Sequence, residues 1–200
     1  MTDVGNKLRT LCVFCGANPG VQPEYVAAGE ALGRLLASRG IALVYGGGGI
    51  GMMGAVARAA LGAGGRVIGV IPERLERKEL AQKGLTELHV VGSMHERKAM
   101  MADRADAFVA LPGGYGTLEE FFEVLTWAQL GFHHKPVALM NTLGFFGPLY
   151  ALLDHMVAEG FVRPPHRGMV LTADAPEPLL EAILAYRPPR VEKWLERDQI

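Results

Sequence analysis

Short apolar runs alternate with longer amphipathic segments along almost the whole chain. Strands are expected at residues 8–15, 41–45, 66–71, 86–91, 107–111, 136–141 and 169–172. The runs are rich in Val, Ile and Leu and are apolar on both faces, which is typical of parallel strands that helices cover on both sides. Helices are expected at 23–38, 145–159 and 176–186, and after each glycine-rich loop. The alternation predicts a doubly wound, mostly parallel α/β sheet, a Rossmann-like three-layer sandwich.

The size of the chain fits one domain. Its 200 residues, half of them hydrophobic, are enough for one core and argue against disorder. We expect a single nucleotide-binding Rossmann-like domain at residues 1–186. Residues 187–200, which begin with Arg187-Pro188-Pro189, are expected to form a separate C-terminal tail.

Composition narrows the functional classes. The net charge of −1 argues against binding to nucleic acid or to a membrane surface through bulk charge. Residues 1–10 contain no apolar signal core, and no run reaches the length of a membrane helix, so a cytoplasmic location is expected. Cys12 and Cys15 lie three residues apart in the first strand and face opposite sides, so both are expected to be buried and reduced.

A first glycine-rich loop, YGGGGIGMMG at residues 45–54, follows the second expected strand. A G-x-G-x-x-G motif begins at Gly49, and Glu73 or Glu76 could bind a ribose, as in dinucleotide-binding proteins. Taken alone, this pattern favours a nicotinamide-dependent oxidoreductase. The alternative is close packing of a helix on a strand, which also requires glycine, and the loop follows the second strand rather than the first.

A second glycine-rich loop, LPGGYGTLEE at residues 111–120, follows the fifth expected strand and begins a helix. Backbone N–H groups at such a junction can bind an anion. Both loops lie at the carboxyl ends of strands, where open α/β sheets bind their ligands. Two glycine loops that face one crevice suit a small phosphate ester such as a mononucleotide.

Glu120 allows two interpretations. With Thr117 as N-cap and Glu120 three residues later, the segment fits a capping box, which is a structural role. The expected apolar stripe of this helix runs through Leu118, Phe121 and Leu125, so Glu120 would point away from the core. The helix dipole would keep such a carboxylate ionised, and it could act as a base or stabilise a cation.

The segment SMHERKAMMADRAD at residues 93–106 combines a second possible capping box, Ser93 and Glu96, with two cations. Arg97 and Lys98 lie in the first helical turn, where the dipole disfavours positive charge. In one interpretation an arriving phosphate pairs with them, because the fork of arginine suits phosphate. In the other, their stems cover the edge of the core and their charged ends stay in water.

Together these motifs resemble the Lonely Guy family of cytokinin riboside 5′-monophosphate phosphoribohydrolases, which are often mislabelled as lysine decarboxylases. PGGYGTLEE at 112–120 matches P-G-G-x-G-T-x-x-E, and MHERK at 94–98 matches M-H-x-R-K. The resemblance extends from VFCGANPG at 13–20 to DHMVAEGFV at 154–162. It implies a Rossmann-like homodimer or higher homo-oligomer. It also implies hydrolysis of the N-glycosidic bond of N6-modified adenosine monophosphates, and often of AMP, to ribose 5-phosphate and a free base, an active cytokinin or adenine.

The resemblance also assigns the residues of the site. Arg97 and Glu120 become the catalytic pair. The implied substrate-binding residues are Gly47, Gly48, Glu79, Met94, Lys98, Pro112, Gly113, Gly114, Gly116 and Thr117. Ala17 and Gly49 stand where the family usually has serine, which bears on affinity or base preference. No metal or cofactor is implied, since the six histidines show no ligand spacing.

A non-catalytic nucleotide or cofactor carrier of the same fold is the rival class. Glu120 separates the two, because a carrier does not need an ionised acid beside a ribose, and that acid would repel a free phosphate ester. The expected partner is a nucleoside monophosphate, without nucleic acid or membrane. The hydrophobic content of 50% adds to the case for an oligomer, since it exceeds what one small domain easily buries.

Overall fold

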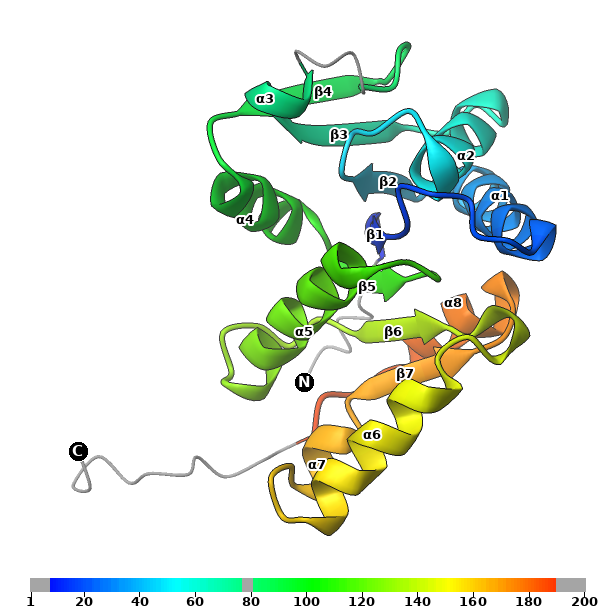
Figure 1. Ribbon diagram of the computed structural model, residues 1–200. Coiled ribbons are helices and arrows are strands. Elements are labelled where there is room, and N and C mark those ends of the chain that lie inside the picture. Colours follow the sequence, from blue (N-terminus) through cyan, green and yellow to red (C-terminus); the bar gives the residue numbers. More distant parts are fainter. Residues whose placement is uncertain (1–7, 77–80, 190–200) are drawn as a thin grey trace, which may run out of the picture.

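Seven parallel strands form one sheet among residues 8–76 and 81–189, which the computed structural model describes (Figure 1). The strands are β1 (Thr10–Phe14), β2 (Ala42–Tyr45), β3 (Val67–Pro72), β4 (Glu87–Val91), β5 (Ala107–Ala110), β6 (Val137–Met140) and β7 (Val170–Ala173). Each strand lies within two residues of its expected bounds, and helices cover both faces. The predicted fold class, a doubly wound α/β sandwich, is confirmed.

Two hydrophobic clusters, one on each face of the sheet, form the core. One face is covered by α1 (Pro23–Ser38), α2 (Gly51–Gly62) and α8 (Pro176–Ala185), and the other by α4 (Met94–Arg104), α5 (Tyr115–Gln129) and α6 (Gly147–Ala158) (Figure 1). Alternate residues of β1 separate the clusters, since Leu11 and Val13 face the first and Cys12 and Phe14 the second. The short helices α3 (Glu73–Glu76), η1 (Thr142–Gly144) and α7 (Pro164–Arg167) have no counterpart in the sequence expectation.

The direction of the strand order reverses beside β1. The sheet runs β4-β3-β2-β1-β5-β6-β7, so the chain builds one half from β1 outward and then returns to place β5 on the other side of β1. Val13 pairs with Val109, and just beyond these strands Gly16 N–H donates to Pro112 O at 3.2 Å. Such a reversal opens a crevice at the carboxyl ends of the strands, where open α/β proteins bind ligands.

Cys12 and Cys15 are both buried and free, and they belong to opposite hydrophobic clusters, as the strand geometry predicts. Within the described ranges, no helix combines the length and hydropathy needed to cross a membrane. Helix α8 ends at Ala185. Most of the predicted tail, residues 190–200, lies outside the described residues, so the domain boundary remains a prediction.

Candidate active site

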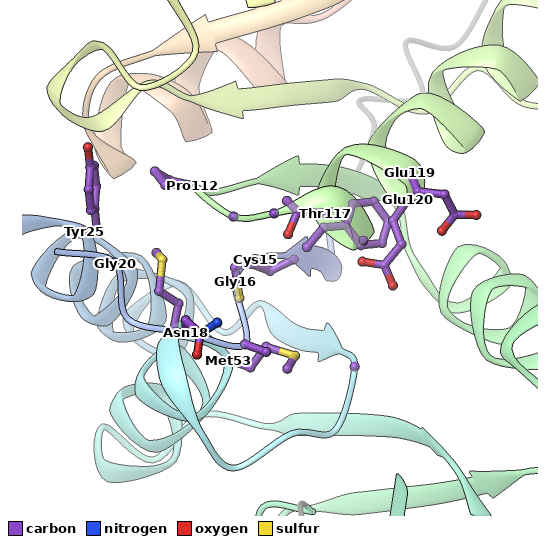
Figure 2. Close-up of a pocket in the computed structure, with 18 of the residues that line it drawn as sticks. Cys15, Gly16, Asn18, Gly20, Tyr25, Met53, Pro112, Thr117, Glu119 and Glu120 are labelled. Carbon is purple, nitrogen blue, oxygen red and sulfur yellow. The ribbon is translucent and has the colours of Figure 1, made fainter. Parts of the chain in front are cut away.

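A cavity of about 430 Å³ opens where the strand order reverses (Figure 2). The loops after β1, β2 and β5 line it together with the first turns of α4 and α5. Thr117 and Glu120 lie at one end of the cavity and Tyr25 at the other (Figure 2). The Tyr25 ring packs edge-on against Phe145, with 5.8 Å between the ring centroids. The α5 end is therefore polar and charged, and the opposite end is aromatic.

The second glycine loop builds the polar end. Gly114 is the N-cap of α5 in an extended conformation, and no side chain caps this helix. Leu118 N–H donates to Gly114 O at 3.2 Å, so the N–H groups before it in the first turn have no partner within the helix. A Cβ atom at Gly113 would lie 2.8 Å from Gly16 N, so glycine is needed for the β5 and β1 loops to touch. The free N–H groups and the helix dipole can bind an anion such as phosphate.

The predicted capping box of α5 is wrong. The N-cap lies three residues before Thr117, so Thr117 is a buried residue of the first turn and Glu120 belongs to the second turn. The buried face of α5 runs through Thr117, Glu120, Phe121 and Val124, so Glu120 points into the protein rather than away from it. The apolar pattern misplaces this face because a charged side chain from another helix lies opposite Glu120.

That side chain is Arg97 of α4. Its Nη1 atom lies 3.2 Å from Glu120 Oε1, and the two side chains are only 11% and 9% exposed. Arg97 Nε also donates to Val70 O at 3.3 Å, which fixes the guanidinium against β3. Glu120 Oε1 accepts no hydrogen bond of good geometry from any described residue. The ion pair is thus a close contact of charges that leaves this oxygen able to accept a proton or a hydrogen bond.

The surroundings of Glu120 control its charge. Burial raises the pKa of Glu120 above its ordinary value of 4.5, and the Arg97 guanidinium opposes this by lowering the pKa. The helix dipole, to which the sequence interpretation assigned the ionised state, acts mainly on the first turn and so has less influence here. Ionisation of Glu120 therefore depends on Arg97.

The second cation of α4 is paired as well. Lys98 Nζ donates to Glu119 and, at 3.0 Å, to Glu123 Oε1, and its side chain is 9% exposed. Carboxylates of α5 therefore pair with both cations, an arrangement that neither interpretation of them included. The predicted capping box of α4 is confirmed, since Ser93 Oγ accepts a hydrogen bond from the N–H of Glu96 at 3.1 Å.

The glycines of the first glycine-rich loop mainly allow close packing around the site. Gly46 faces the cavity, and a Cβ atom there would lie 2.9 Å from Arg97 Cζ and closer still to Nη2. Gly47 O accepts from Gln82 N at 2.9 Å, and neither residue is among the described residues that line the cavity. A Cβ atom at Gly54 would lie 2.5 Å from Gly49 C, so the apparent dinucleotide fingerprint reflects close packing of α2 on its loop.

Comparison with known proteins supports the family resemblance of the P-G-G-x-G-T-x-x-E and M-H-x-R-K motifs. The model of the family described as "Possible lysine decarboxylase" matches residues 53–183. The chain is 52% identical to the probable cytokinin riboside 5′-monophosphate phosphoribohydrolase LOGL5 of Oryza sativa subsp. japonica, covering 92% of this chain and 75% of that protein. It is 49% identical to the cytokinin riboside 5′-monophosphate phosphoribohydrolase of Rhodococcoides fascians, covering 88% and 89%.

The chain belongs to the Lonely Guy family. A third relative, LOG3 of Arabidopsis thaliana, also named a cytokinin riboside 5′-monophosphate phosphoribohydrolase, is 48% identical over 92% of this chain and 85% of that protein. Among solved structures, the molybdenum cofactor binding protein of Rippkaea orientalis is similar, with a TM-score of 0.67 over 88% of this chain and 96% of that one. At 22% identity this likeness shows the fold alone.

Most of the site residues that the family motifs predict lie together around the cavity of this Lonely Guy protein. Those that line the cavity are Met94, Arg97, Pro112, Gly113, Gly114, Gly116, Thr117 and Glu120. Gly47, Gly48 and Lys98 are not among the described residues that line it. Glu79 lies outside the described residues.

Several residues that line the cavity were not predicted from the sequence to belong to the site. They are Cys15, Gly16, Asn18, Gly20, Tyr25, Gly46, Met52, Met53 and Phe145. The signal for some of them was the CGANPG segment directly after the first strand, because that loop borders the reversal of the sheet. Ala17, which replaces a usual serine, also lines the cavity, whereas Gly49 packs against Gln82.

Proposed function

We propose that the protein is a phosphoribohydrolase that cleaves the N-glycosidic bond of N6-modified adenosine 5′-monophosphate and of AMP. The products are the free base and ribose 5-phosphate. The observation that carries the proposal is the buried Arg97–Glu120 pair beside an anion-binding helix N-terminus, in one cavity. Relatives of about half-identical sequence bear the name of this reaction.

The residues divide the work along the cavity. The N–H groups of residues 113–117, at the start of α5, hold the 5′-phosphate, which orients the ribose toward the second turn of this helix. Breaking the bond between C1′ and the base builds positive charge on the ribose, as in glycoside hydrolysis. The Glu120 carboxylate stabilises this charge and takes a proton from the water that attacks C1′. The base departs with the electron pair of the broken bond and gains a proton on nitrogen.

Chromatography after incubation with AMP and with N6-isopentenyl-AMP tests the proposal. Release of adenine or N6-isopentenyladenine together with ribose 5-phosphate supports it. A nucleotide that binds and stays intact would instead favour the carrier of the same fold. The buried Glu120 carboxylate argues against a carrier. An ionised Glu120 repels a phosphate ester, and a protein that only carried the ester would gain nothing from that repulsion.

The phosphate should be required for efficient turnover. In the proposed binding mode, the free N–H groups at the start of α5 bind the phosphate ester, which adenosine lacks. We expect kcat/KM for adenosine to be about 10²-fold or more below that for AMP, since remote binding supplies orientation at C1′. Parallel assays of the two compounds measure the ratio, and equal values would remove the glycine loop from the mechanism.

We also propose that the protein is a homo-oligomer, at least a dimer. Strand β4 is an edge of the sheet, and its Leu88 and Val90 side chains are 40% and 49% exposed, an arrangement that a second copy would cover. Light scattering should give a mass at least twice 21.5 kDa, and a monomer mass at working concentration would contradict the proposal. We place the protein in the cytoplasm, which imaging of a fluorescent fusion would test.

A further inference from the structure

Lys98 belongs to a family motif but does not face the cavity. Its side chain is 9% exposed, and it is absent from the described lining residues. Its ammonium group donates to the carboxylates of Glu119 and Glu123 on α5. Burial of a cation is unfavourable unless it is paired, so these two carboxylates stabilise Lys98 where it stands.

Adjacent residues of α4 therefore bind adjacent residues of α5. Arg97 contacts Glu120, and Lys98 contacts Glu119 and Glu123. Helix α4 packs on β1 to β4, whereas α5 packs on β1, β5 and β6, so the two helices sit on opposite sides of the reversal in the sheet. These ion pairs join α4 to α5 and so fix the position of Arg97 relative to Glu120.

Charge within this cluster also argues against a phosphate at Lys98. Three carboxylates of α5 face two cations of α4, which leaves a formal excess of one negative charge. A phosphate that approached Lys98 would have to displace Glu119 or Glu123 and enter a negative cluster. The free N–H groups at the start of α5 offer a phosphate a site without that competition.

We propose that Lys98 is a positioning residue rather than a phosphate ligand, because it holds Glu119 and Glu123 so that Glu120 faces Arg97 with its negative neighbours neutralised. The inference rests on the proposed function, in which Glu120 acts as a carboxylate. It differs from the role implied by the family motif, where Lys98 is counted with the substrate-binding residues.

Electrostatics support this role. The groups that act on Glu120 or respond to it are Arg97 and Lys98 on α4, Glu119 and Glu123 on α5, and Cys12 and Cys15 from β1 and the loop after it. Beyond the effects of burial and Arg97, Glu119 and Glu123 raise the pKa of Glu120 and Lys98 lowers it. Burial raises the pKa of both thiols, so they add no charge. Loss of Lys98 would therefore raise the pKa of Glu120.

Lys98→Met tests the inference, since it removes the charge and keeps an unbranched stem. Activity that needs ionised Glu120 falls as pH drops through its pKa, so the acidic limb of the kcat–pH profile should move to higher pH by about one unit. On the acidic side of the limb we expect kcat for AMP to fall about tenfold, and we expect KM to stay within about threefold. Lys98→Arg should restore the wild-type profile.

A phosphate ligand would behave differently. If Lys98→Met raised KM for AMP more than about tenfold and left the limb in place, the positioning role would be overturned. Lys135→Met is a matched control, because the Lys135 ammonium donates to Ala102 O at 2.8 Å, away from the cavity. It should leave the limb and KM unchanged.

A triple variant keeps the test available if Lys98→Met does not fold. Lys98→Met with Glu119→Gln and Glu123→Gln removes all three charges, so no unpaired ion remains around Glu120 and the limb should return toward its wild-type position. A raised KM in this variant would also overturn the inference.

If the wild-type protein released no base from AMP, the proposed function would fail instead. NMR titration of the Glu120 carboxyl in wild type and Lys98→Met would then decide the inference without any activity.

Discussion

Glu120→Gln is expected to lower kcat for AMP by about 10²-fold or more, while KM stays the same or falls. The amide keeps the size of the side chain and an oxygen near Arg97. It cannot accept a proton from water, and it carries no charge to stabilise the positive ribose. Steady-state kinetics with AMP, together with nucleotide binding by calorimetry, separate the loss of turnover from any loss of affinity.

The free energy of unfolding should fall as pH rises through the folded-state pKa of Glu120. Because burial raises the folded-state pKa of Glu120, its contribution to stability is present below about pH 4.5 and is lost as pH rises through the folded pKa. Glu120→Gln should lack this dependence. At neutral pH the variant should be at least as stable as the wild type, because the amide stays neutral where the buried carboxylate must ionise. Thermal unfolding at several pH values measures both effects.

Glu30→Gln provides the control for the carboxylate-to-amide change. Glu30 lies on α1 in an exposed pair with Arg34, and its loss should alter kcat by less than about twofold. If Glu120→Gln kept near-normal turnover and only lowered the melting temperature, Glu120 would be a structural partner of Arg97. The catalytic carboxylate would then have to be sought elsewhere, first at Glu119, which also lines the cavity.

The fold was accessible from the sequence because its signals are local. Each strand is a short apolar run, and the helix at 23–38 matches α1 residue for residue. The parallel order follows from the alternation of strands and helices. The short helices α3 and α7 carry too few residues for a periodic pattern, so nothing in the sequence separates them from loops.

The site was accessible only in part, because much of it depends on contacts between distant segments. The two motifs identify Arg97 and Glu120, but no local pattern shows that they form a buried pair. The capping box of α5 fitted the residue types, yet the preceding glycines let the helix begin earlier. Tyr25 reaches the cavity through its position near the start of α1, which only the assembled sheet reveals.

Gly46→Ala is expected to lower kcat/KM for AMP by about 10²-fold, although it adds a single methyl group. The new Cβ atom would lie 2.9 Å from Arg97 Cζ and overlap Nη2. The guanidinium cannot retreat freely, since Val70 O holds its Nε atom and Glu120 lies 3.2 Å from Nη1. It must therefore shift by about an ångström, and a misplacement of that size in a catalytic site costs about 10²-fold.

The fold should tolerate the substitution. Gly46 is not in the left-handed region that excludes other residues, so alanine can adopt its backbone conformation. Gly62→Ala, where a Cβ atom would meet nothing within 4 Å, is the matched control and should keep normal activity. Normal kinetics of Gly46→Ala with an unchanged melting temperature would mean that Arg97 works from more than one position. Its close contact with Glu120 would then not be required for turnover.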